Sequence, residues 1–157
     1  MSEFERPVCL PVLALRGLCV FPKMLTHFDV GRKSSMAAVE EALREDQQIF
    51  LVTQKDVETD HPKRNDLYTV GTVSIVKQVL RLPGENMRIL VEGQYRAELL
   101  DIVQSEPYLF GRMQKLEELP YNHSLPRVEA LLRQAHSQFE QFAELSGRNM
   151  QEALLRL

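Results

Sequence analysis

The residue types that perform covalent chemistry are few in this sequence, and their spacing matches no known catalytic motif. Cys19 and His27 are close enough in sequence to form a nucleophilic pair, although a cysteine of this kind is more often a small buried thiol. None of the histidines belongs to a His-x-x-x-His or His-Glu-x-x-His arrangement that would bind a metal. They are widely separated, at His27, His61, His123 and His136.

Motifs for phosphate binding and acyl transfer are also missing from the sequence. The seven glycines are scattered singly, so neither a phosphate loop nor a dinucleotide-binding glycine cluster is present, and no Gly-x-Ser-x-Gly elbow occurs. The adjacent carboxylates of Glu40-Glu41 and Glu117-Glu118 are poor acid–base partners, because neighbours in a helix point in different directions. We therefore expect this chain to be non-catalytic, with no metal and no cofactor of its own.

Composition indicates a folded protein of the cytoplasm. Of the 157 residues, 44% are hydrophobic and 26% are charged, which is typical of a globular domain. The net charge of −3 argues against a general nucleic-acid binder, and no apolar run approaches the roughly 20 residues of a membrane span. Cys9 and Cys19 are expected to be reduced, buried thiols, and the charged N-terminus lacks the apolar core of a signal peptide.

The elements that would position a binding site are mostly short strands. Alternation and turn signals predict seven of them, at 7–14, 24–30, 48–53, 70–81, 86–92, 95–103 and 108–117. Ser34 is the predicted N-cap of a helix through Arg44, and Gly93 is expected to separate the fifth strand from the sixth. The polar segment 55–66 is expected to be a solvated loop, with contact to a substrate or a neighbouring subunit as the alternative. These elements predict an α+β, mainly β domain over 1–119: a small, partly closed barrel with one inserted helix.

The sequence changes character after Pro120. An apolar face from Val128 to Leu145 predicts a helix over 126–145, used either for packing or for pairing between subunits, and Gly147 is its predicted C-cap. Another amphipathic stretch begins at Met150 and stops at Leu157. We therefore expect 120–157 to be the start of a helical segment, in the front part of a longer protein.

A binding surface can be predicted from the alternation of the strands. On 24–30 the core face carries Phe28 and Val30, which leaves Leu25 and His27 on the outer face. The same argument places apolar residues among charged ones on the outer face of the two later strands. The predicted exposed apolar surface consists of Leu25, His27, Val76, Leu80 and Leu90, extended by Phe21 and Pro22 of the preceding loop. The alternative is that a helix or loop covers this face, so that both faces of the sheet are buried.

Several separate segments, in a consistent order, resemble a known family. They are Leu10–Arg16, Val30–Arg32 before a helix, Ile49–Lys55, Asp66–Val73, Arg81–Gly84 and Leu90–Gly93, with a weaker match at Ser137–Glu140. Together they resemble the N-terminal domain of bacterial ATP-dependent Lon protease, over nearly all of 7–119. The resemblance implies a pseudo-barrel related to the PUA fold, followed by helices that lead to an ATPase and a Ser-Lys peptidase.

What the resemblance implies for function is substrate recognition. The expected partners are unfolded or damaged proteins, bound through exposed apolar surface, and other copies of the same chain in a hexameric ring. ATP and Mg²⁺ are implied for the ATPase domain, which this chain does not contain. Two alternatives remain at this point: a stand-alone adaptor or holdase on the same barrel, and an RNA-binding module suggested only by the related fold.

Overall fold

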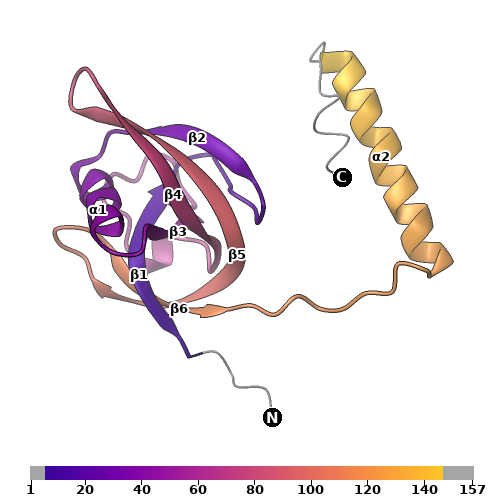
Figure 1. The fold of residues 1–157 in the computed structure, drawn as a ribbon, viewed down its shortest axis with the longest axis horizontal. Helices are drawn as coiled ribbons and strands as arrows, with labels where there is room; N and C mark the ends of the chain where they lie inside the picture. The colour runs from indigo at the N-terminus through magenta and orange to yellow at the C-terminus, as the bar shows by residue number, and fades with distance from the viewer. Residues whose placement is uncertain (1–5, 147–157) are drawn as a thin grey trace. The chain divides into compact units, whose positions relative to one another are not determined.

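The computed structural model describes residues 6–146 of the chain. Its first part contains six strands, one α-helix and a short 3₁₀ turn, in the order shown in Figure 1. The strands are β1 (Val8–Leu15), β2 (Leu25–Val30), β3 (Gln48–Thr53), β4 (Val70–Leu82), β5 (Asn86–Gln104) and β6 (Phe110–Lys115). The helical elements are α1 (Lys33–Arg44), η1 (Arg64–Asp66) and α2 (Pro126–Ser146).

The six strands form one sheet that closes into a barrel. Their order is β2-β5-β4-β3-β1-β6, and β6 pairs back onto β5. The long strand β5 makes closure possible, because it pairs with β2 over its first half and with β6 over its second half. Figure 1 shows β5 curving along one side of the barrel and α1 on the opposite side, near β1. The predicted mainly β barrel with one inserted helix is confirmed.

The helix α1 is inserted between strands that need a crossover connection. β1 and β3 run parallel, with Leu13 opposite Leu51, whereas all other pairings are antiparallel. Parallel neighbours cannot be joined by a tight turn, so the chain passes through α1, which packs mainly on β1 and β3. The helix begins at Lys33 with Arg32 as its N-cap residue, two residues earlier than the predicted Ser34 cap.

Both faces of β1 and β3 are buried, which explains their continuous apolar runs. Leu13 and Ile49 belong to a core cluster shared with α1, β4 and β5. Val12 and Phe50, which point the other way, belong to a second cluster with residues of β4, β5 and β6. Every residue from Val12 to Leu15 is therefore buried. The alternation of apolar and polar residues that marks a half-exposed strand is absent from this segment.

The predicted break at Gly93 is wrong, because 86–92 and 95–103 belong to the single strand β5. The pairing with β4 skips Gln94, which forms a bulge: Val73 lies opposite Tyr95 and Ser74 opposite Gly93. A glycine is needed at position 93 because a Cβ there would lie 2.1 Å from the carbonyl oxygen of Phe21. Gly93 therefore marks a close approach of backbone, not the end of a strand.

The predicted outward position of Val76 is also wrong. A second bulge skips Lys77, since Val76 lies opposite Val91 and Gln78 opposite Leu90. The extra residue reverses the alternation, so that Val76 and Val79 both pack on the same core and Val76 is only 1% exposed. The predicted burial of the two cysteines is also wrong, because Cys9 and Cys19 are free thiols and both are exposed.

Contacts divide the chain into two units, with the boundary between Glu117 and Glu118. In the second unit, α2 contains no buried residue among those that the structure describes, and Arg133 forms an ion pair with Glu129 one turn away. The predicted cap at Gly147 and the stretch from Met150 lie outside the described residues. No helix in the described part is long and apolar enough to cross a membrane.

Candidate functional site

The outer face of β2, β5 and β4 carries most of the predicted binding residues in neighbouring rows. In the first row, His27 lies opposite Leu90, and Leu90 lies opposite Gln78. In the next row, Arg88 of β5 lies between Asp29 of β2 and Leu80 of β4. Side chains of one row on one face stand close together across antiparallel strands, so these residues form a continuous patch.

The centre of this patch is a shallow hollow. It has a volume of about 310 Å³ and is lined by His27, Gln78, Leu80, Arg88 and Leu90. Leu80 is 55% exposed, His27 is exposed, and Leu90 is half-buried between its neighbours. We refer to Leu25, His27, Gln78, Leu80 and Leu90 as the apolar surface, and Arg88 belongs to its charged border. Three of the seven predicted residues thus meet in one hollow.

Ion pairs border the apolar surface on two sides. Arg88 donates from two nitrogens to the two carboxylate oxygens of Asp29, at 2.6 and 3.1 Å, and Lys77 pairs with Glu92 at 2.7 Å. The hydrogen bond from Arg88 lowers the pKa of Asp29, and the same bond raises the pKa of Arg88. Exposed pairs of this kind add little stability. Their effect here is to keep charged groups around the leucines.

Phe21, Pro22 and Leu25 lie toward the opposite end of the β2–β5 pair. Leu25 faces Glu92 across the strands and is 55% exposed, on the same side of β2 as His27. The preceding loop is held on β5 by two backbone bonds: Lys23 N–H to the Gly93 oxygen at 2.8 Å, and Gly93 N–H to the Met24 oxygen at 2.9 Å. Pro22 is half-buried in this loop.

The ring of Phe21 is held in place although it is exposed. It is 54% exposed, and the guanidinium of Arg96 lies 5.1 Å from its centroid, within the range of a cation–π contact. Six of the seven predicted residues are therefore at least partly accessible. Val76 is the exception and belongs to the core.

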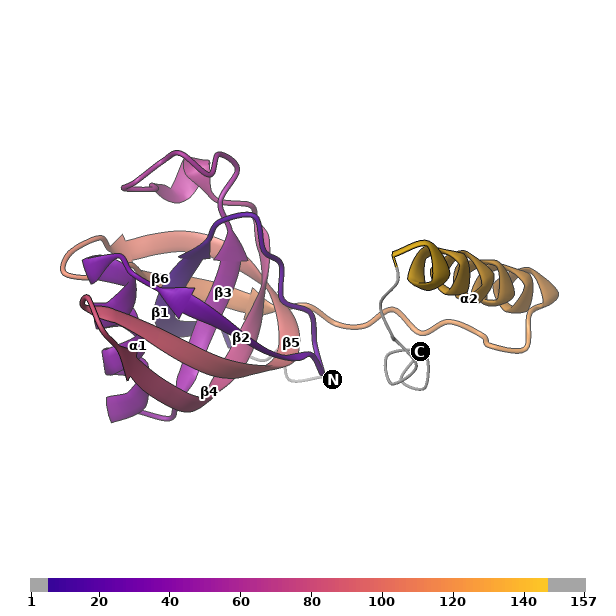
Figure 2. The same ribbon diagram turned by 90° about the horizontal axis from the view of Figure 1, so that it is seen from above.

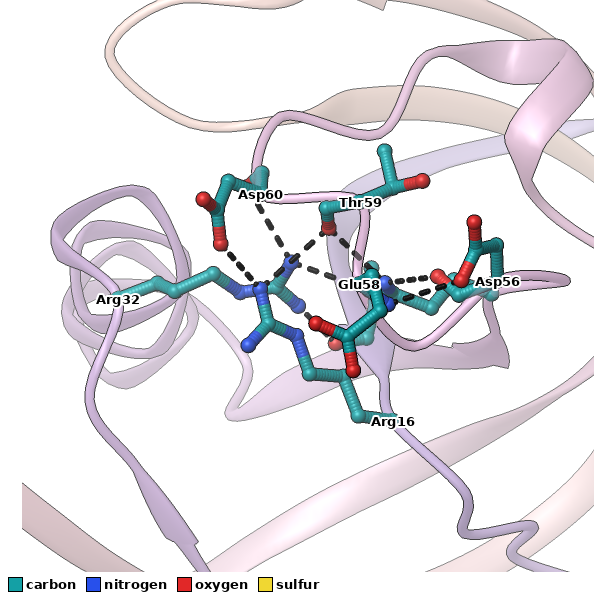
Figure 3. Close-up of polar contacts among 8 residues, drawn as sticks. Arg16, Arg32, Asp56, Glu58, Thr59 and Asp60 are labelled. Atoms are coloured by element: carbon teal, nitrogen blue, oxygen red, sulfur yellow. Dashed lines mark hydrogen bonds and ion pairs between the residues drawn. The ribbon is translucent and has the colours of Figure 1, made fainter.

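A second polar arrangement was not predicted from the sequence. The loop after β3 projects from one end of the barrel in Figure 2, and its base is tied down by the side chains drawn in Figure 3. Gln54 is 2% exposed, and its Nε2 donates to the carbonyls of Asp56 at 2.7 Å and Thr59 at 3.0 Å. The loop expected to be simply solvated is thus anchored through a buried amide. Only the three-dimensional structure shows this anchoring, because the sequence of the segment is simply polar.

Two arginines complete this anchor. Arg32 donates to the oxygens of Ala14 and Gln54, at 2.5 and 3.0 Å, while Arg16 pairs with Asp60 at 2.7 Å. Figure 3 shows both guanidinium groups pointing toward the 59–60 backbone. Partial burial, and secondarily the charge of Arg16, lower the pKa of Arg32, whereas Arg16 lowers the pKa of Asp60. We call Arg16, Arg32, Gln54 and Asp60 the loop anchor.

Within residues 6–146, no group of three or more His, Cys, Asp or Glu side chains could hold a metal. In the same range, no hydrogen bond joins Cys19 to His27, the one nucleophilic pair that the sequence suggested, and Cys19 is an exposed free thiol. The two regions differ in construction: one is an exposed hollow on the sheet, and the other is a hydrogen-bonded loop base.

Comparison with known proteins agrees with this geometry. The sequence model of the ATP-dependent protease La (LON) substrate-binding domain matches residues 9–156. The chain belongs to this family. It is 44% identical to the Lon protease of Syntrophomonas wolfei over 137 residues, and 39% identical to Lon protease 1 of Bacillus subtilis over 145 residues. These alignments cover 87% and 92% of this chain but only 17% and 18% of the relatives, so the chain spans less than a fifth of their length.

Solved structures confirm the LON substrate-binding fold. The N-terminal domain of Lon protease from the Mycobacterium avium complex matches with a TM-score of 0.74 and 18% identity, covering 96% of this chain and 76% of that one. The Lon N-terminal domain protein from Xanthomonas campestris matches with a TM-score of 0.55 and 14% identity, covering 75% and 68%. At these identities the likeness establishes the fold alone.

Proposed function

We propose that the apolar surface binds exposed apolar segments of unfolded or damaged proteins, on behalf of an ATP-dependent serine protease of which this chain is the substrate-recognition part. The observation that carries the proposal is the hollow between β2, β5 and β4. Two leucines and a histidine meet there without a covering element among residues 6–117, inside a border of ion pairs. Exposed apolar patches with a polar rim are a recurrent mark of interaction sites.

The chemistry of the surface suits a substrate recognised by its state of folding. Leucine side chains discriminate little among apolar partners, whereas a native protein hides the side chains that they would contact. Binding through a few leucines is weak, so several linked copies would be needed for firm capture. ATP and Mg²⁺ would act in the remainder of the longer protein and not at these residues.

An NMR titration tests the proposal. One test protein is added to the folded chain in its native form and in a destabilised, unfolded form. We expect only the unfolded form to shift amide signals, with the shifts concentrated on β2, β5 and β4. Leu80→Asp should weaken binding about tenfold, because it places a charge where an apolar group must dock.

A matched control separates this surface from apolar exposure in general. Val103 lies near the other end of β5 and is 55% exposed, the same fraction as Leu80. Val103→Asp should leave binding of the unfolded protein unchanged. Equal losses in the two variants, or equal shifts with native and unfolded protein, would contradict substrate recognition at the apolar surface.

The proposal includes a part in assembly with other copies of the chain. What supports it is α2, where Leu131 and Phe142 are 57% and 58% exposed within the described residues. Such a helix gains stability only by pairing. Sedimentation of the chain at increasing concentration should show self-association that Leu131→Lys removes. A chain that stays monomeric at all concentrations contradicts this role for α2.

The two alternative functions make different predictions. A stand-alone adaptor or holdase would use the same surface, but the reading frame beyond this chain would encode neither a phosphate loop nor a Ser-Lys pair. An RNA-binding module would show strong affinity that falls steeply with salt concentration. Filter binding to single-stranded RNA at two salt concentrations checks the second alternative.

A further inference from the structure

A separate cavity of about 400 Å³ shares no lining residue with the apolar surface. Its lining comes from β1, the first turn of α1, the loop that contains η1, and the connection from β5 to β6. One wall is polar and includes Arg32, Ser34, Ser35, Lys63 and Arg64. Another wall is apolar and includes Val12, Ile102 and Leu109. This volume is within the range of small-molecule sites.

Positive charge predominates in the lining. Arg32 donates to the oxygens of Ala14, Gln54 and Asp60, all of which are carbonyl or amide oxygens, and Arg64 donates to the carbonyl of Leu99. Neither arginine forms an ion pair among the described residues, and neither does Lys63.

The acidic groups nearby neutralise this charge only in part. Glu106 is the one carboxylate in the lining, and the carboxylate of Asp60 is paired with Arg16 and also interacts with the charge of Arg32. His61, also in the lining, is exposed. Three permanent cations thus face one carboxylate, in a chain whose overall net charge is −3. The local excess of positive charge is a property of this cavity.

The first turn of α1 adds hydrogen-bond donors to this charge. Met36 is the first residue whose N–H bonds within the helix, to the oxygen of Arg32, so the N–H groups of residues 33–35 have no intrahelical acceptor. Arg32 makes no side-chain cap bond, and the first turn contains no acidic residue. A helix of 12 residues beginning this way presents an uncompensated positive end.

Ser35 gives a further indication of a ligand. This residue is 8% exposed and lines the cavity, and its hydroxyl forms no hydrogen bond with the described residues. The one fully buried side-chain oxygen without a partner in residues 6–146 is Asp101 Oδ1, so the Ser35 hydroxyl is accessible to solvent and can also be reached by a ligand. A ligand oxygen in the cavity can therefore bond to it.

We propose that this cavity binds a small organic phosphate ester. The phosphate group sits against the first turn of α1, where the backbone N–H groups, the Ser35 hydroxyl and the cations of residues 32, 63 and 64 surround it. The organic group lies against the apolar wall of Val12, Ile102 and Leu109. The combination of a cationic end and an apolar wall in one cavity selects an ester over a bare anion.

Titration of the chain with phenyl phosphate and with inorganic phosphate, at constant ionic strength, tests the proposal by NMR. We expect saturable shifts of the amides of residues 33–36 below about 10 mM, a range in which weak specific sites fill. Ser35→Ala and Lys63→Gln should each raise the dissociation constant by about three- to tenfold. Neither side chain has a partner among the described residues, so both variants should fold normally, which their melting temperatures will check.

Lys33→Gln is the matched control. It removes a positive charge from the same turn of α1, but Lys33 lines a different cavity together with Glu40 and Arg81. Because charges at the surface are screened over about 8 Å at physiological salt, the dissociation constant should change by less than about twofold. If Lys33→Gln lowers the affinity as much as Lys63→Gln does, the binding depends on general surface charge, and the proposed site is overturned.

The two probes distinguish the sources of the phosphate group. Tighter binding of phenyl phosphate supports the ester, whereas equal affinities would overturn that assignment and identify free phosphate as the ligand. Shifts that grow linearly without saturation, or that spread over surface lysines, would overturn the site altogether. The outcome is independent of the proposed substrate recognition, because the probes contain no protein and the variants lie outside the apolar surface.

Discussion

The apolar surface and the loop anchor belong to one barrel but are built in opposite ways. Leu80 is 55% exposed, whereas Gln54 is 2% exposed and bonded through both ends of its amide. The apolar surface consists of side chains that stand on a finished sheet and make few contacts of their own. The loop anchor consists of side chains that bond to backbone oxygens and to one another. We expect the apolar surface to tolerate substitution with a smaller loss of stability than the loop anchor.

The largest expected effect concerns Val76 and Leu80, which both lie on β4. Val76→Asp should lower the free energy of unfolding by at least about 4 kcal/mol, because it buries an unpaired carboxylate in the core. Leu80→Asp, four residues further on but exposed, should lower it by less than about 1 kcal/mol. Urea unfolding of both variants measures the contrast. Similar losses in the two would show that the outer face of β4 is covered.

Gly93→Ala should reveal the one intolerant position at the edge of the apolar surface. The added methyl group would lie 2.1 Å from the Phe21 oxygen, so the loop must move, at an expected cost of about 3 kcal/mol. Gly31→Ala is the control, because its methyl group would meet only the amide oxygen of the exposed Asn86 side chain, which can rotate away. Thermal unfolding should separate the two variants clearly, and equal melting temperatures would contradict the close approach.

Gln54→Ala should destabilise the loop anchor by about 2 kcal/mol, since it removes the short amide bonds to the carbonyls of Asp56 and Thr59. These carbonyls then keep only the longer bonds from Thr59 N–H at 3.3 Å and from Arg16 at 3.4 Å. Amide hydrogen exchange in the segment 55–66 should become faster. Gln78→Ala removes the same side chain from the apolar surface, where it is exposed, and should change stability by less than about 0.5 kcal/mol. Unchanged exchange in Gln54→Ala would mean that the loop holds its shape without this amide.

The smallest effect is expected at the border of the apolar surface. The bond from Arg88 lowers the pKa of Asp29, so the folded state binds this proton less readily than the unfolded state does. The contribution is therefore present at neutral pH and is lost as the pH falls through the ordinary carboxyl range and below it. Titration of the Asp29 carboxyl signal should give a higher pKa in Arg88→Gln than in the original chain. An unaltered pKa would show that the pair is not formed in solution.

The sequence was sufficient to predict which strand residues face outward wherever regular alternation continues into the folded structure. Alternation placed Leu25 and His27 on the outer face of β2, and Leu90 on the outer face of β5, as the structure has them. Serine preference put the helix start at Ser34, although the backbone already turns at Arg32. The helix starts there without a side-chain cap, so cap preference gave the wrong residue.

Where the sequence was insufficient, a single inserted residue was responsible. Nothing local marks Lys77 or Gln94 as a bulge, yet the first turns Val76 into the core and the second keeps β5 continuous past Gly93. The loop anchor depends on residues separated along the chain, Arg32 and Gln54, that meet only when α1 and β3 are in place. The periodicity of apolar residues does not reveal which side chains far apart in the sequence come into contact.

Pairing of the first strand with the last has a consequence for synthesis on the ribosome. The start of β1 lies against β6, with Val8 opposite Met113, and its second half lies against β3. A nascent chain can therefore form the β4–β5 hairpin early, but its N-terminal strand has no complete set of neighbours until β6 has emerged from the exit tunnel. Until that moment the apolar residues of β1 lack part of their final neighbours and remain accessible to chaperones that shield emerging chains.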